Sequence, residues 1–456
     1  MGFRFNDIEE SEKTMMNFEE KVKKGGRVYV ETYGCQMNFS DTEILLSILL
    51  DNGFYETGEI SDADVIFLNT CSVRKHAEDK IYSRLNSLKK LKKSKPHLII
   101  GLLGCMAERV KRELFNKFEF LDLITGPDEY RKLPELIRSV RRGEKGIAIK
   151  LSKTETYDDI TPYRKVGVNA WISIMRGCDK FCSFCIVPFT RGRERSRSYN
   201  SIIKEAHCLY NEGVKEIILL GQNVNSYRYN DFDFADLLIA VANATGNTRI
   251  RFTTSHPYDL SEKLLKAIAS KENICKYLHL PVQSGSDKIL KLMNRHYTIE
   301  DYKAVINKAR ELIPEIGIST DLISGFPGET DEDHKLTLKL IEEVQFDSAF
   351  TFIYSPREGT KAFKLKDDVP LELKKKRLSE IINLQRKISL NIHKKLIGKK
   401  KQILIESYSK RSKDFLMGRT DCNKTVIIPK GNYNIGDFVN VKIKKVNSAT
   451  LFGTVI

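Results

Sequence analysis

Short apolar runs alternate along the chain with stretches in which apolar residues recur every three or four positions. Runs of the first kind are typical of buried parallel strands, and stretches of the second kind are typical of amphipathic helices. In the first third of the chain the strand-like runs fall at residues 27–33, 64–70 and 97–104, and the helical stretches near 40–51, 76–92 and 107–116. This alternation predicts a small doubly wound α/β domain, which we place at residues 26–150.

A second series of the same kind contains six strand–helix units. Its strand-like runs fall at residues 171–175, 216–223, 249–255, 277–283, 317–325 and 350–355, and its helical stretches near 199–212, 233–244, 260–270, 299–312 and 331–344. Thr330 and Asp333 have the spacing of a capping pair at the start of the last of these helices. Six consecutive units predict a partial (β/α)6 barrel, which we place at residues 164–396 with a helical connector at its end.

The last 60 residues have a different pattern, with short strand-like runs separated by Gly and Asn turns. They predict a small antiparallel β-barrel at residues 397–456. This segment holds 12 Lys and Arg against 4 Asp and Glu, which is half of the chain's net charge of +16. Concentrated positive charge on a small β-barrel favours RNA binding, and a solvated basic surface is the alternative. Residues 1–25 form an N-terminal extension without an interpretable pattern.

The composition excludes several classes of protein. With 456 residues, 41% of them hydrophobic and 30% charged, the chain is an ordinary globular protein. No apolar run approaches the ~18 residues that a membrane span needs, and the N-terminus lacks a secretory pattern, so we expect a cytoplasmic protein without a membrane partner. Nine cysteines are an odd number. In a chain without an export signal they indicate metal or redox chemistry rather than disulfides.

The strongest chemical motif is a C-x3-C-x2-C loop directly after the strand-like run 171–175, formed by Cys178, Cys182 and Cys185. Three thiolates can hold three irons of a [4Fe–4S] cluster and leave the fourth iron open for a substrate. A structural zinc site is the alternative, but it needs a fourth ligand, and the nearest candidates are His207 and Cys208. The loop therefore predicts an iron–sulfur cluster.

Three further cysteines follow the three strand-like runs of the first domain: Cys35, Cys71 and Cys105. The carboxyl ends of parallel strands meet at one edge of a sheet, so we expect the three thiols to lie together there. They predict a second three-thiolate cluster site. The alternative is three buried cysteines without a ligand, since cysteine is often interior.

The cluster loop, with an aromatic residue before its last cysteine, resembles the radical S-adenosylmethionine (SAM) superfamily. This resemblance implies a partial barrel in which the open iron binds SAM, and electron transfer to SAM then gives a 5′-deoxyadenosyl radical. The whole chain from about residue 26 resembles the methylthiotransferases, whose third domain is TRAM-like. The motifs that carry this resemblance are YGCQMN (33–38), NTCSVR (69–74), GCMAER (104–109), RGCDKFCSFCIVPFTRGRERSR (176–197), GQNVNSY (221–227), HLPVQSGS (279–286) and GFPGET (325–330).

Within that family the chain resembles the MiaB type, the tRNA-2-methylthio-N6-dimethylallyladenosine synthases, and GQNVNSY is the main discriminating motif. The resemblance implies a transferase that adds SCH3 to C2 of N6-isopentenyladenosine at position 37 of tRNA. One SAM would methylate a sulfur atom and a second would give the radical. The alternatives are a methylthiotransferase for threonylcarbamoyl-adenosine or for a ribosomal-protein aspartate, and a non-catalytic metal-bearing RNA-binding protein.

No catalytic side chain is predicted beyond the six cluster cysteines. Near the cluster loop and at the strand ends we expect SAM to contact Phe184, Ile186, Gln222, Asn223, Ser255, Gln283 and Asp321, although each residue could instead be a core or capping residue. Candidate RNA-phosphate contacts are Arg191, Arg193, Arg195 and Arg197, with salt bridges on the barrel rim as the alternative. The expected partners of a monomeric enzyme are the tRNA anticodon stem-loop and a low-potential flavodoxin- or ferredoxin-like electron donor.

Overall fold

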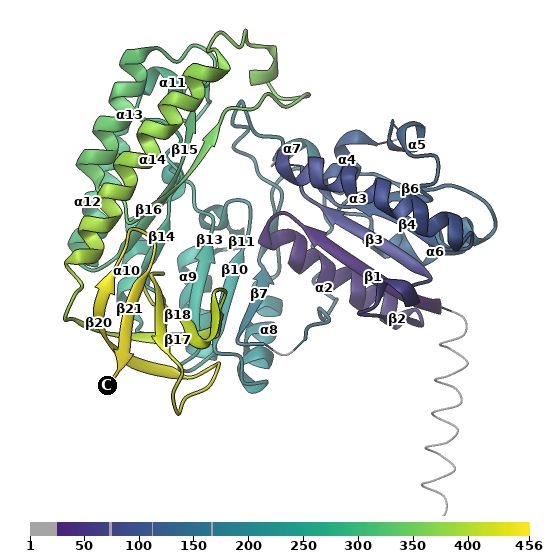
Figure 1. Cartoon of the computed structure of the whole chain (residues 1–456), viewed down its shortest axis with the longest axis horizontal. Coiled ribbons are helices and arrows are strands. Elements are labelled where there is room, and N and C mark those ends of the chain that lie inside the picture. Colours follow the sequence, from purple (N-terminus) through teal and green to yellow (C-terminus); the bar gives the residue numbers. More distant parts are fainter. Residues whose placement is uncertain (1–24, 73–74, 112, 166) are drawn as a thin grey trace, which may run out of the picture. The chain divides into compact units, whose positions relative to one another are not determined.

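The computed structural model describes residues 25–72, 75–111, 113–165 and 167–456, and these residues form two compact units (Figure 1). The first unit contains the described residues up to Lys165 together with Ile186–Arg195. The second contains the described part of Val166–Cys185 together with Ser196–Ile456. Apart from Gly25, the predicted N-terminal extension lies outside the described residues. The domain boundaries inferred from the sequence stay predictions.

The first unit is built on a six-stranded parallel sheet with the order β2-β1-β3-β4-β5-β6. Its strands are β1 (Gly26–Tyr33), β2 (Phe54–Glu56), β3 (Val65–Thr70), β4 (Ile99–Leu103), β5 (Leu123–Thr125) and β6 (Gly146–Ala148). The three predicted strands are β1, β3 and β4, and they are neighbours in the sheet. The sequence pattern missed the other three strands, each of which has three residues.

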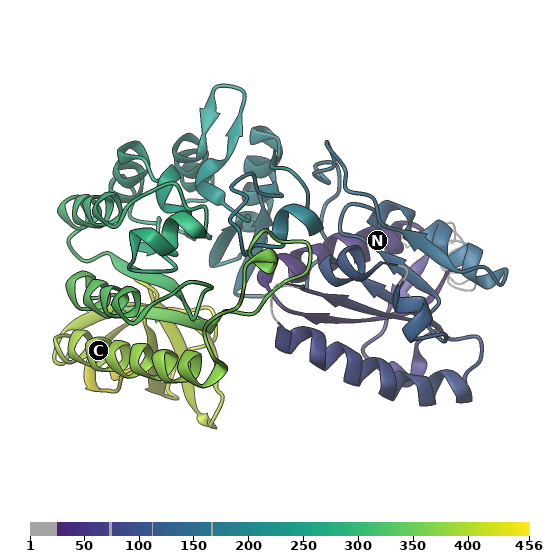
Figure 2. The same ribbon diagram turned by 90° about the horizontal axis from the view of Figure 1, so that it is seen from above.

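Helices cover both faces of this sheet (Figure 2). They are α2 (Gln36–Asp51) and α6 (Leu133–Arg141) on one face, and α3 (Lys75–Ser94), α4 (Cys105–Val110) and α5 (Glu113–Lys117) on the other, with short turns η1 (Ile60–Asp62) and η2 (Tyr130–Lys132). Strand β3 shows the reason. Val65 and Phe67 pack in the apolar cluster that contains residues of α2, whereas Ile66 and Leu68 pack in the apolar cluster that contains residues of α3. Because alternate residues of a strand face opposite sides, an uninterrupted apolar strand needs helices on both faces. The predicted doubly wound domain is confirmed.

The second unit contains two three-stranded parallel sheets, with the orders β13-β10-β7 and β14-β15-β16. A parallel bridge between Ile250 and Ile274 lies where one sheet continues into the other. The strands are β7 (Asn169–Ser173), β10 (Glu216–Leu220), β13 (Arg249–Thr253), β14 (Tyr277–His279), β15 (Gly317–Ser324) and β16 (Ser348–Ile353). These are the six predicted strands, and the predicted partial (β/α)6 barrel is confirmed.

The helices of this unit agree with the predicted series, except that the short helix α11 (Asp287–Leu292) was not predicted. The others are α8 (Tyr199–Asn211), α9 (Phe234–Ala244), α10 (Glu262–Ser270), α12 (Ile299–Leu312), α13 (Asp331–Val344) and the connector α14 (Leu371–Lys394). The shorter elements are β8 (Met175–Arg176), β9 (Arg195–Ser196), β11 (Arg228–Tyr229), β12 (Phe232–Asp233), η3 (Val224–Ser226), η4 (Pro257–Asp259) and η5 (Ala362–Lys364). Helix α7 (Val187–Thr190) falls in the first unit.

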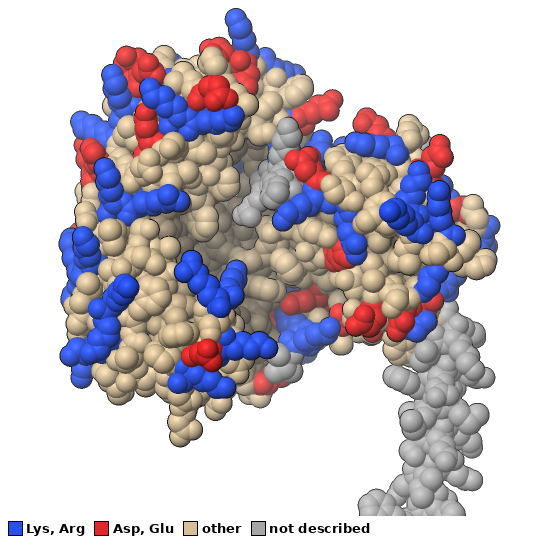
Figure 3. Space-filling view, in the orientation of Figure 1, with Lys and Arg blue, Asp and Glu red and all other residues tan. Residues whose placement is uncertain are grey.

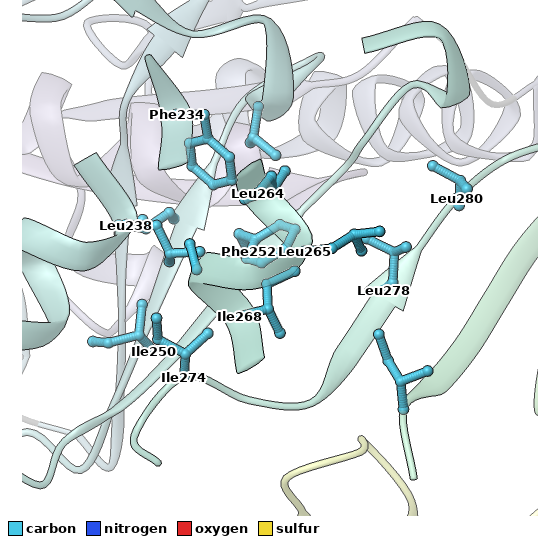
Figure 4. Close-up of a cluster of buried hydrophobic side chains, with 14 of the residues drawn as sticks. Phe234, Leu238, Ile250, Phe252, Leu264, Leu265, Ile268, Ile274, Leu278 and Leu280 are labelled. Carbon is cyan, nitrogen blue, oxygen red and sulfur yellow. The ribbon is translucent and has the colours of Figure 1, made fainter. Parts of the chain in front are cut away.

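The core of the second unit lies between the strands and the helices that cover them. Phe234 of α9 and Phe252 of β13 meet edge to face at 5.1 Å, beside Leu264 and Ile268 of α10 (Figure 4). Each of these side chains is at most 2% exposed. Burial of such a side chain contributes about 1.5–3 kcal/mol, so the core holds the strand ends in fixed positions.

The C-terminal residues form a closed five-stranded barrel with the order β17-β18-β19-β21-β20. Its strands are β17 (Lys400–Ser409), β18 (Ser412–Thr420), β19 (Thr425–Pro429), β20 (Phe438–Val446) and β21 (Leu451–Val455). The predicted small barrel is confirmed, and its pairs are antiparallel except for the parallel pair β19–β21. Among the residues that the structure describes, no helix is both long enough and apolar enough to cross a membrane.

Buried charges join this barrel to the parallel strands of the same unit. Arg251 of β13 donates to Glu216 of β10 at 3.0 Å, and it also donates to the carbonyl oxygens of Thr420 and Asp421 at 3.1 and 2.9 Å. Arg249 donates to the carbonyl oxygen of Arg419 at 2.7 Å. The side chains of Arg251 and Glu216 are 5% and 0% exposed, so the junction is a structural contact.

Candidate functional site

The three cysteines of the first unit lie where three neighbouring strands end. Cys35 is the N-cap of α2, with one residue between it and the end of β1. Cys71 directly follows β3, and Cys105 is the first residue of α4, with one residue between it and the end of β4. The backbone N–H of Cys71 donates to the carbonyl oxygen of Tyr33 at 3.2 Å, which joins the first two strand ends. Because β1, β3 and β4 are adjacent and parallel, all three thiols belong to one edge of the sheet.

Two glycines allow these strand ends to approach each other closely. Gly34 has a φ of +116°, and a Cβ atom added to it would lie 2.3 Å from Cβ of Cys71. Gly104 has a φ of +86°, and its added Cβ would lie 2.4 Å from Oδ1 of Asn69. Only glycine adopts such backbone angles without strain and leaves this space open. Positions 34 and 104 therefore require glycine for the strand ends to approach each other this closely.

The environment of the thiols favours the thiolate form at Cys35. A hydrogen bond with Cys71 and the positive charge of Arg191 lower the pKa of Cys35 to about 6. Burial raises the pKa of Cys105, and the charge of Arg191 opposes this effect. The thiolate is the form of cysteine that binds metal. Three thiols at one sheet edge with a buried cation beside them fit the ligand set of an iron–sulfur cluster.

Among the described residues, no three His, Cys, Asp or Glu side chains lie close enough together to hold a single metal ion. A [4Fe–4S] cluster does not require its three ligands to meet at one ion, because each thiolate binds its own iron at a separate corner of the cube. The fit at the first unit therefore rests on the donor set and on its common sheet edge.

The cluster loop of the second unit follows β8 and is held by the last residue of α11 and by residues that follow this helix. A turn within the loop is closed by the N–H of Cys185, which donates to the carbonyl oxygen of Cys182 at 2.9 Å. Nδ2 of Asn294 donates to the carbonyl oxygen of Phe181 at 3.0 Å, and Oγ of Ser183 donates to that of Leu292 at 2.7 Å. These bonds fix the backbone that carries Cys178, Cys182 and Cys185.

Arg295 is a residue of this site that the sequence did not reveal. Its Nη1 donates to Sγ of Cys182 at 3.4 Å, its Nη2 donates to the carbonyl oxygen of Pro281 at 2.6 Å, and the residue is 4% exposed. It lies 113 residues after Cys182 along the chain. No local pattern distinguishes it from other arginines, and only the fold shows that it touches a cluster ligand.

Four buried polar atoms without a hydrogen-bond partner among the described residues lie at the ends of β10 and β13. They belong to Gln222, Asn223, Ser255 and His256: Oε1, Oδ1, Oγ and Nε2 respectively. The two strands are paired, with Leu220 opposite Thr253, so these residues share one sheet edge. Leaving a buried polar atom unpaired costs about 1–3 kcal/mol, so this edge fits a polar ligand such as SAM. The first three residues are predicted SAM contacts, and His256 is not among the predicted contacts.

A chain of contacts connects this edge to the cluster loop. Lys180 of the loop forms an ion pair with Asp259 at 2.6 Å, and the other carboxylate oxygen of Asp259 accepts a hydrogen bond from Nδ2 of Asn223 at 2.6 Å. Asn225 exchanges two hydrogen bonds with the backbone of His256, at 2.8 and 2.9 Å. The predicted residues Asn223 and Ser255 therefore lie at the same end of the partial (β/α)6 barrel as the cluster loop.

The other predicted SAM residues are placed as follows. Phe184 meets Phe326 edge to face at 6.5 Å, at the side of a small apolar cluster. Gln283 has a φ of +75°, and its N–H donates to the carbonyl oxygen of Asp321 at 2.8 Å, while the Asp321 carboxylate lies 3.4 Å from Nε2 of His279. Ile186 is buried and falls in the first unit. Contact of these residues with SAM stays a prediction.

Three of the four arginines for which RNA contacts are predicted lie in buried ion pairs. Arg191, Arg195 and Arg197 are at most 7% exposed, and they form ion pairs with Asp41, Asp128 and Glu205 respectively. A phosphate cannot reach these guanidinium groups without displacing a buried carboxylate. The local run of alternating arginines indicated positive charge but could not reveal carboxylates that are distant in sequence. Arg193 is exposed, and its RNA contact stays a prediction.

The C-terminal barrel exposes aromatic and basic side chains together. Tyr408 and Phe415 are 43% and 42% exposed on β17 and β18. The exposed basic residues near them and on β20 are Lys410, Arg411, Lys413, Lys430, Lys442, Lys444 and Lys445. Figure 3 shows that Lys and Arg outnumber Asp and Glu on the face of this barrel that it presents, at the lower left. Aromatic rings among cations suit single-stranded RNA, whose bases stack on such rings.

The fold and the cluster loop define a radical SAM protein, and residues 172–341 match the Radical SAM superfamily. Residues 27–126 match Uncharacterized protein family UPF0004, and residues 394–456 match the TRAM domain. Among solved structures, the chain is similar to the radical S-adenosylmethionine methyltransferase TsrM from Kitasatospora setae, with a TM-score of 0.55 and 14% identity over 71% of this chain and 72% of that chain. At that identity the likeness concerns the fold alone.

Two relatives match almost the whole chain, and each is named tRNA-2-methylthio-N(6)-dimethylallyladenosine synthase. The protein of Azobacteroides pseudotrichonymphae genomovar. CFP2 is 54% identical over 96% of this chain and 99% of its own length. The protein of Chloroherpeton thalassium is 53% identical over 94% of this chain and 96% of its own length. The chain therefore belongs to the tRNA-2-methylthio-N(6)-dimethylallyladenosine synthase family. The predicted family is confirmed, and the alternative readings are not favoured.

Proposed function

We propose that this chain is a radical-SAM tRNA methylthiotransferase that adds SCH3 to C2 of N6-isopentenyladenosine at position 37 of tRNA. The names and near-complete coverage of its relatives support this substrate. The C2–H bond of adenosine is neither acidic nor electrophilic enough for polar chemistry, so radical chemistry suits it. A base of the anticodon loop is single-stranded and can enter a pocket at a modest cost in stacking.

The observation that supports the proposal is that a set of three cysteines follows the carboxyl ends of parallel strands in each of the two units. One site consists of Cys178, Cys182 and Cys185, and the other of Cys35, Cys71 and Cys105. Each donor set fits a [4Fe–4S] cluster that keeps one iron without a protein ligand. Methylthiolation needs two such places, because the radical and the sulfur to be transferred are handled separately.

Cys178, Cys182 and Cys185 would hold the cluster of the second unit, which would supply the electron for SAM cleavage and so the radical chemistry needed at C2–H. The chain's own residues prepare this chemistry. Asn294 and Arg295 hold the loop that carries the thiolates, and the unpaired atoms of Asn223 and Ser255 orient a polar ligand beside it. The apolar cluster next to Phe184 limits the access of water to this end of the barrel.

The expected partners follow from this activity. The anticodon stem-loop of tRNA would meet the basic and aromatic surface of the C-terminal barrel, which supports its role in RNA binding. Reduction of the cluster needs a low-potential electron, which a flavodoxin- or ferredoxin-like protein supplies. We expect the enzyme to work as a monomer in the cytoplasm, where its tRNA substrate is found.

The test compares cysteine variants of the anaerobically reconstituted full-length protein with isopentenylated tRNA, SAM and dithionite. Cys182→Ala should abolish formation of 5′-deoxyadenosine. Cys71→Ala should lose about half of the iron and still cleave SAM, but it should give no methylthiolated nucleoside. Iron content, 5′-deoxyadenosine and nucleoside mass are measured for each variant. Cys208→Ala is the matched control, because Cys208 is exposed and belongs to neither site.

Full iron content and normal methylthiolation in Cys71→Ala would show that the N-terminal cysteines hold no cluster. An active wild type that modifies only threonylcarbamoyl-adenosine would contradict the proposed substrate while leaving the two clusters in place. The first result would contradict the second cluster, and the second result would contradict the substrate alone.

A further inference from the structure

Arg191 is a buried cation in the first unit, and it lies beside the three cysteines of that unit. Its side chain is 3% exposed, and its Nη2 donates to Oδ2 of Asp41 at 2.7 Å and to Oδ1 of Asn38 at 3.3 Å. The same Oδ1 atom of Asn38 accepts a hydrogen bond from Sγ of Cys35 at 3.2 Å. One amide oxygen therefore connects the guanidinium group to a proposed cluster ligand.

The second guanidinium nitrogen of Arg191 has no such partner. Nη1 is buried and makes no hydrogen bond within the described residues. An unpaired buried donor costs about 1–3 kcal/mol, and more when it is charged. The positive charge of Arg191 also acts on two of the three thiols, since it helps to lower the pKa of Cys35 and opposes the burial that raises the pKa of Cys105. A charged donor is thus present at the thiols. Apart from the thiol of Cys105, whose pKa a hydrogen bond with Arg191 helps to lower, Nη1 has no protein acceptor among the described residues.

An iron–sulfur cluster would supply that acceptor. A [4Fe–4S] cluster on three thiolates has a net negative charge, and its reduction adds one more electron. Hydrogen bonds to the sulfurs and nearby positive charge stabilise the reduced form and raise the reduction potential. In a buried place the effect is larger, because the dielectric screening is weaker than in water.

We propose that Arg191 is a positioning residue for the three-cysteine cluster of the first unit, to which Nη1 donates a hydrogen bond at a sulfur atom. Its charge makes that cluster easier to reduce, and Asp41 moderates this charge. The inference rests on the proposed function, because it requires the second cluster. It assigns to Arg191 a role in the redox properties of this site in place of the predicted RNA contact.

Arg195 shows that burial in this segment does not by itself imply such a role. It lies four residues further along, is similarly buried, and pairs with Asp128 at 2.9 Å. Its other nitrogen atoms donate to the carbonyl oxygens of Ser152 and Glu155 at 2.6 and 3.1 Å. These bonds satisfy Arg195 with protein oxygen atoms, so it serves as a matched control for Arg191.

The test measures the reduction of this cluster alone. The parent is the full-length protein with Cys178→Ala, Cys182→Ala and Cys185→Ala, which leaves the first unit as the cluster site. It is reconstituted with iron and sulfide and titrated with dithionite and mediators, and the reduced form is followed by electron paramagnetic resonance. At a fixed potential, Arg191→Gln should lower the ratio of reduced to oxidised cluster at least tenfold, which is a shift of about 59 mV for one electron.

Two further variants make the result specific. Asp41→Asn should shift the ratio in the opposite direction, because it removes the carboxylate that offsets the charge of Arg191. Arg195→Gln removes a buried ion pair of the same kind and should change the ratio less than about twofold. Damage to the fold alone would not shift the ratio upward in one variant and downward in the other.

An Arg191→Gln variant with full iron and an unchanged ratio would overturn the inference, as would an Asp41→Asn variant whose ratio falls or stays unchanged. If Arg191→Gln retains no iron, the test uses Arg191→Lys, which keeps the positive charge. A ratio of reduced to oxidised cluster within about threefold of the parent would then support the inference. Loss of iron in Arg191→Lys as well would overturn it. A parent that binds no iron would contradict the second cluster of the proposed function, and the inference would fall with it.

Discussion

Gly34 controls how closely the strand end that carries Cys35 approaches the one that carries Cys71. A methyl group at Gly34 would meet Cβ of Cys71 at 2.3 Å in a backbone conformation that disfavours side chains. We expect Gly34→Ala to separate the two thiols and to lower the iron content of the reconstituted protein to about half, with the cluster of the second unit retained. Iron analysis and SAM cleavage measure both effects.

Gly58→Ala is the control for this substitution, because an added Cβ there meets no atom within 4 Å. It should keep its full iron content. A Gly34→Ala protein with normal iron and normal methylthiolation would show that the close approach of the two strand ends is unimportant for the site.

His256 should make the stability of the protein depend on pH. Burial, together with the charges of Arg295 and Lys180, lowers the pKa of His256 from 6.5 to about 2. The unfolded chain therefore binds a proton below pH 6.5 that the folded chain does not bind, and the free energy of unfolding falls as the pH falls through this range. Between about pH 7.5 and about pH 5.5 the contribution is about 1.4 kcal/mol.

Urea unfolding of the protein without its clusters tests this expectation at the two pH values. His256→Asn should lose about 1.4 kcal/mol less than the wild type over this interval. His207→Asn, at an exposed position, should behave as the wild type does. Equal pH dependence in the wild type and His256→Asn would refute the assignment of a neutral buried histidine.

At this scale, the six cysteines could be predicted because their positions after apolar runs and their spacing are local features of the sequence. Gln222, Asn223 and Ser255 could be proposed for the same reason, as polar residues at strand ends. Arg295 and the partners of Arg191 could not, because their contacts join residues more than 100 positions apart. A run of arginines shows charge, and the fold decides which of them reach solvent.

At the scale of elements, the hairpin of β17 and β18 is the part of the C-terminal barrel best suited to test RNA binding. Lys410 and Lys413 are exposed at this hairpin beside Tyr408 and Phe415. Each cation that pairs with a phosphate adds ~0.7–0.9 to the steepness of log affinity against log salt. Lys410→Gln with Lys413→Gln should therefore weaken tRNA binding and make that slope shallower by about 1.5.

Filter binding at several salt concentrations measures this slope. Lys308→Gln with Lys339→Gln removes the same charge from α12 and α13 of the same unit and should leave the slope unchanged. An equal change of slope in the two double variants would mean that only net charge matters and that the hairpin does not bind RNA specifically.

The regular elements could be predicted where a periodic pattern extends over five or more residues. Helix α13 begins as its capping pair indicated, since Thr330 and Asp333 form a reciprocal capping box. The three-residue strands β2, β5 and β6 were missed, whereas the three-residue strand β14 was predicted because it begins the longer apolar run 277–283. The parallel pair β19–β21 could not be anticipated either, because pairing direction within a closed barrel depends on the whole chain path.

At the scale of the whole molecule, Arg251 and Glu216 connect the C-terminal barrel to the parallel strands. Removal of Arg251 leaves the buried carboxylate of Glu216 with Arg419, at 3.4 Å, as its remaining cation. Loss of one partner of a buried ion pair typically costs about 3–5 kcal/mol. We expect Arg251→Met to lower the free energy of unfolding by about 4 kcal/mol, and the double variant Glu216→Leu with Arg251→Met to recover most of this loss. Denaturant unfolding measures both values, and equal stability of all three proteins would contradict a structural role for the pair.

The discontinuous first unit has a consequence for the order in which the protein is made. Lys165 emerges from the ribosome before the cluster loop does, yet the unit is complete only when Ile186–Arg195 has followed. Until then Asp41 and Asp128 lack the arginines that neutralise them in the folded protein. The first unit is therefore completed by a segment that is synthesised only after all six cluster cysteines.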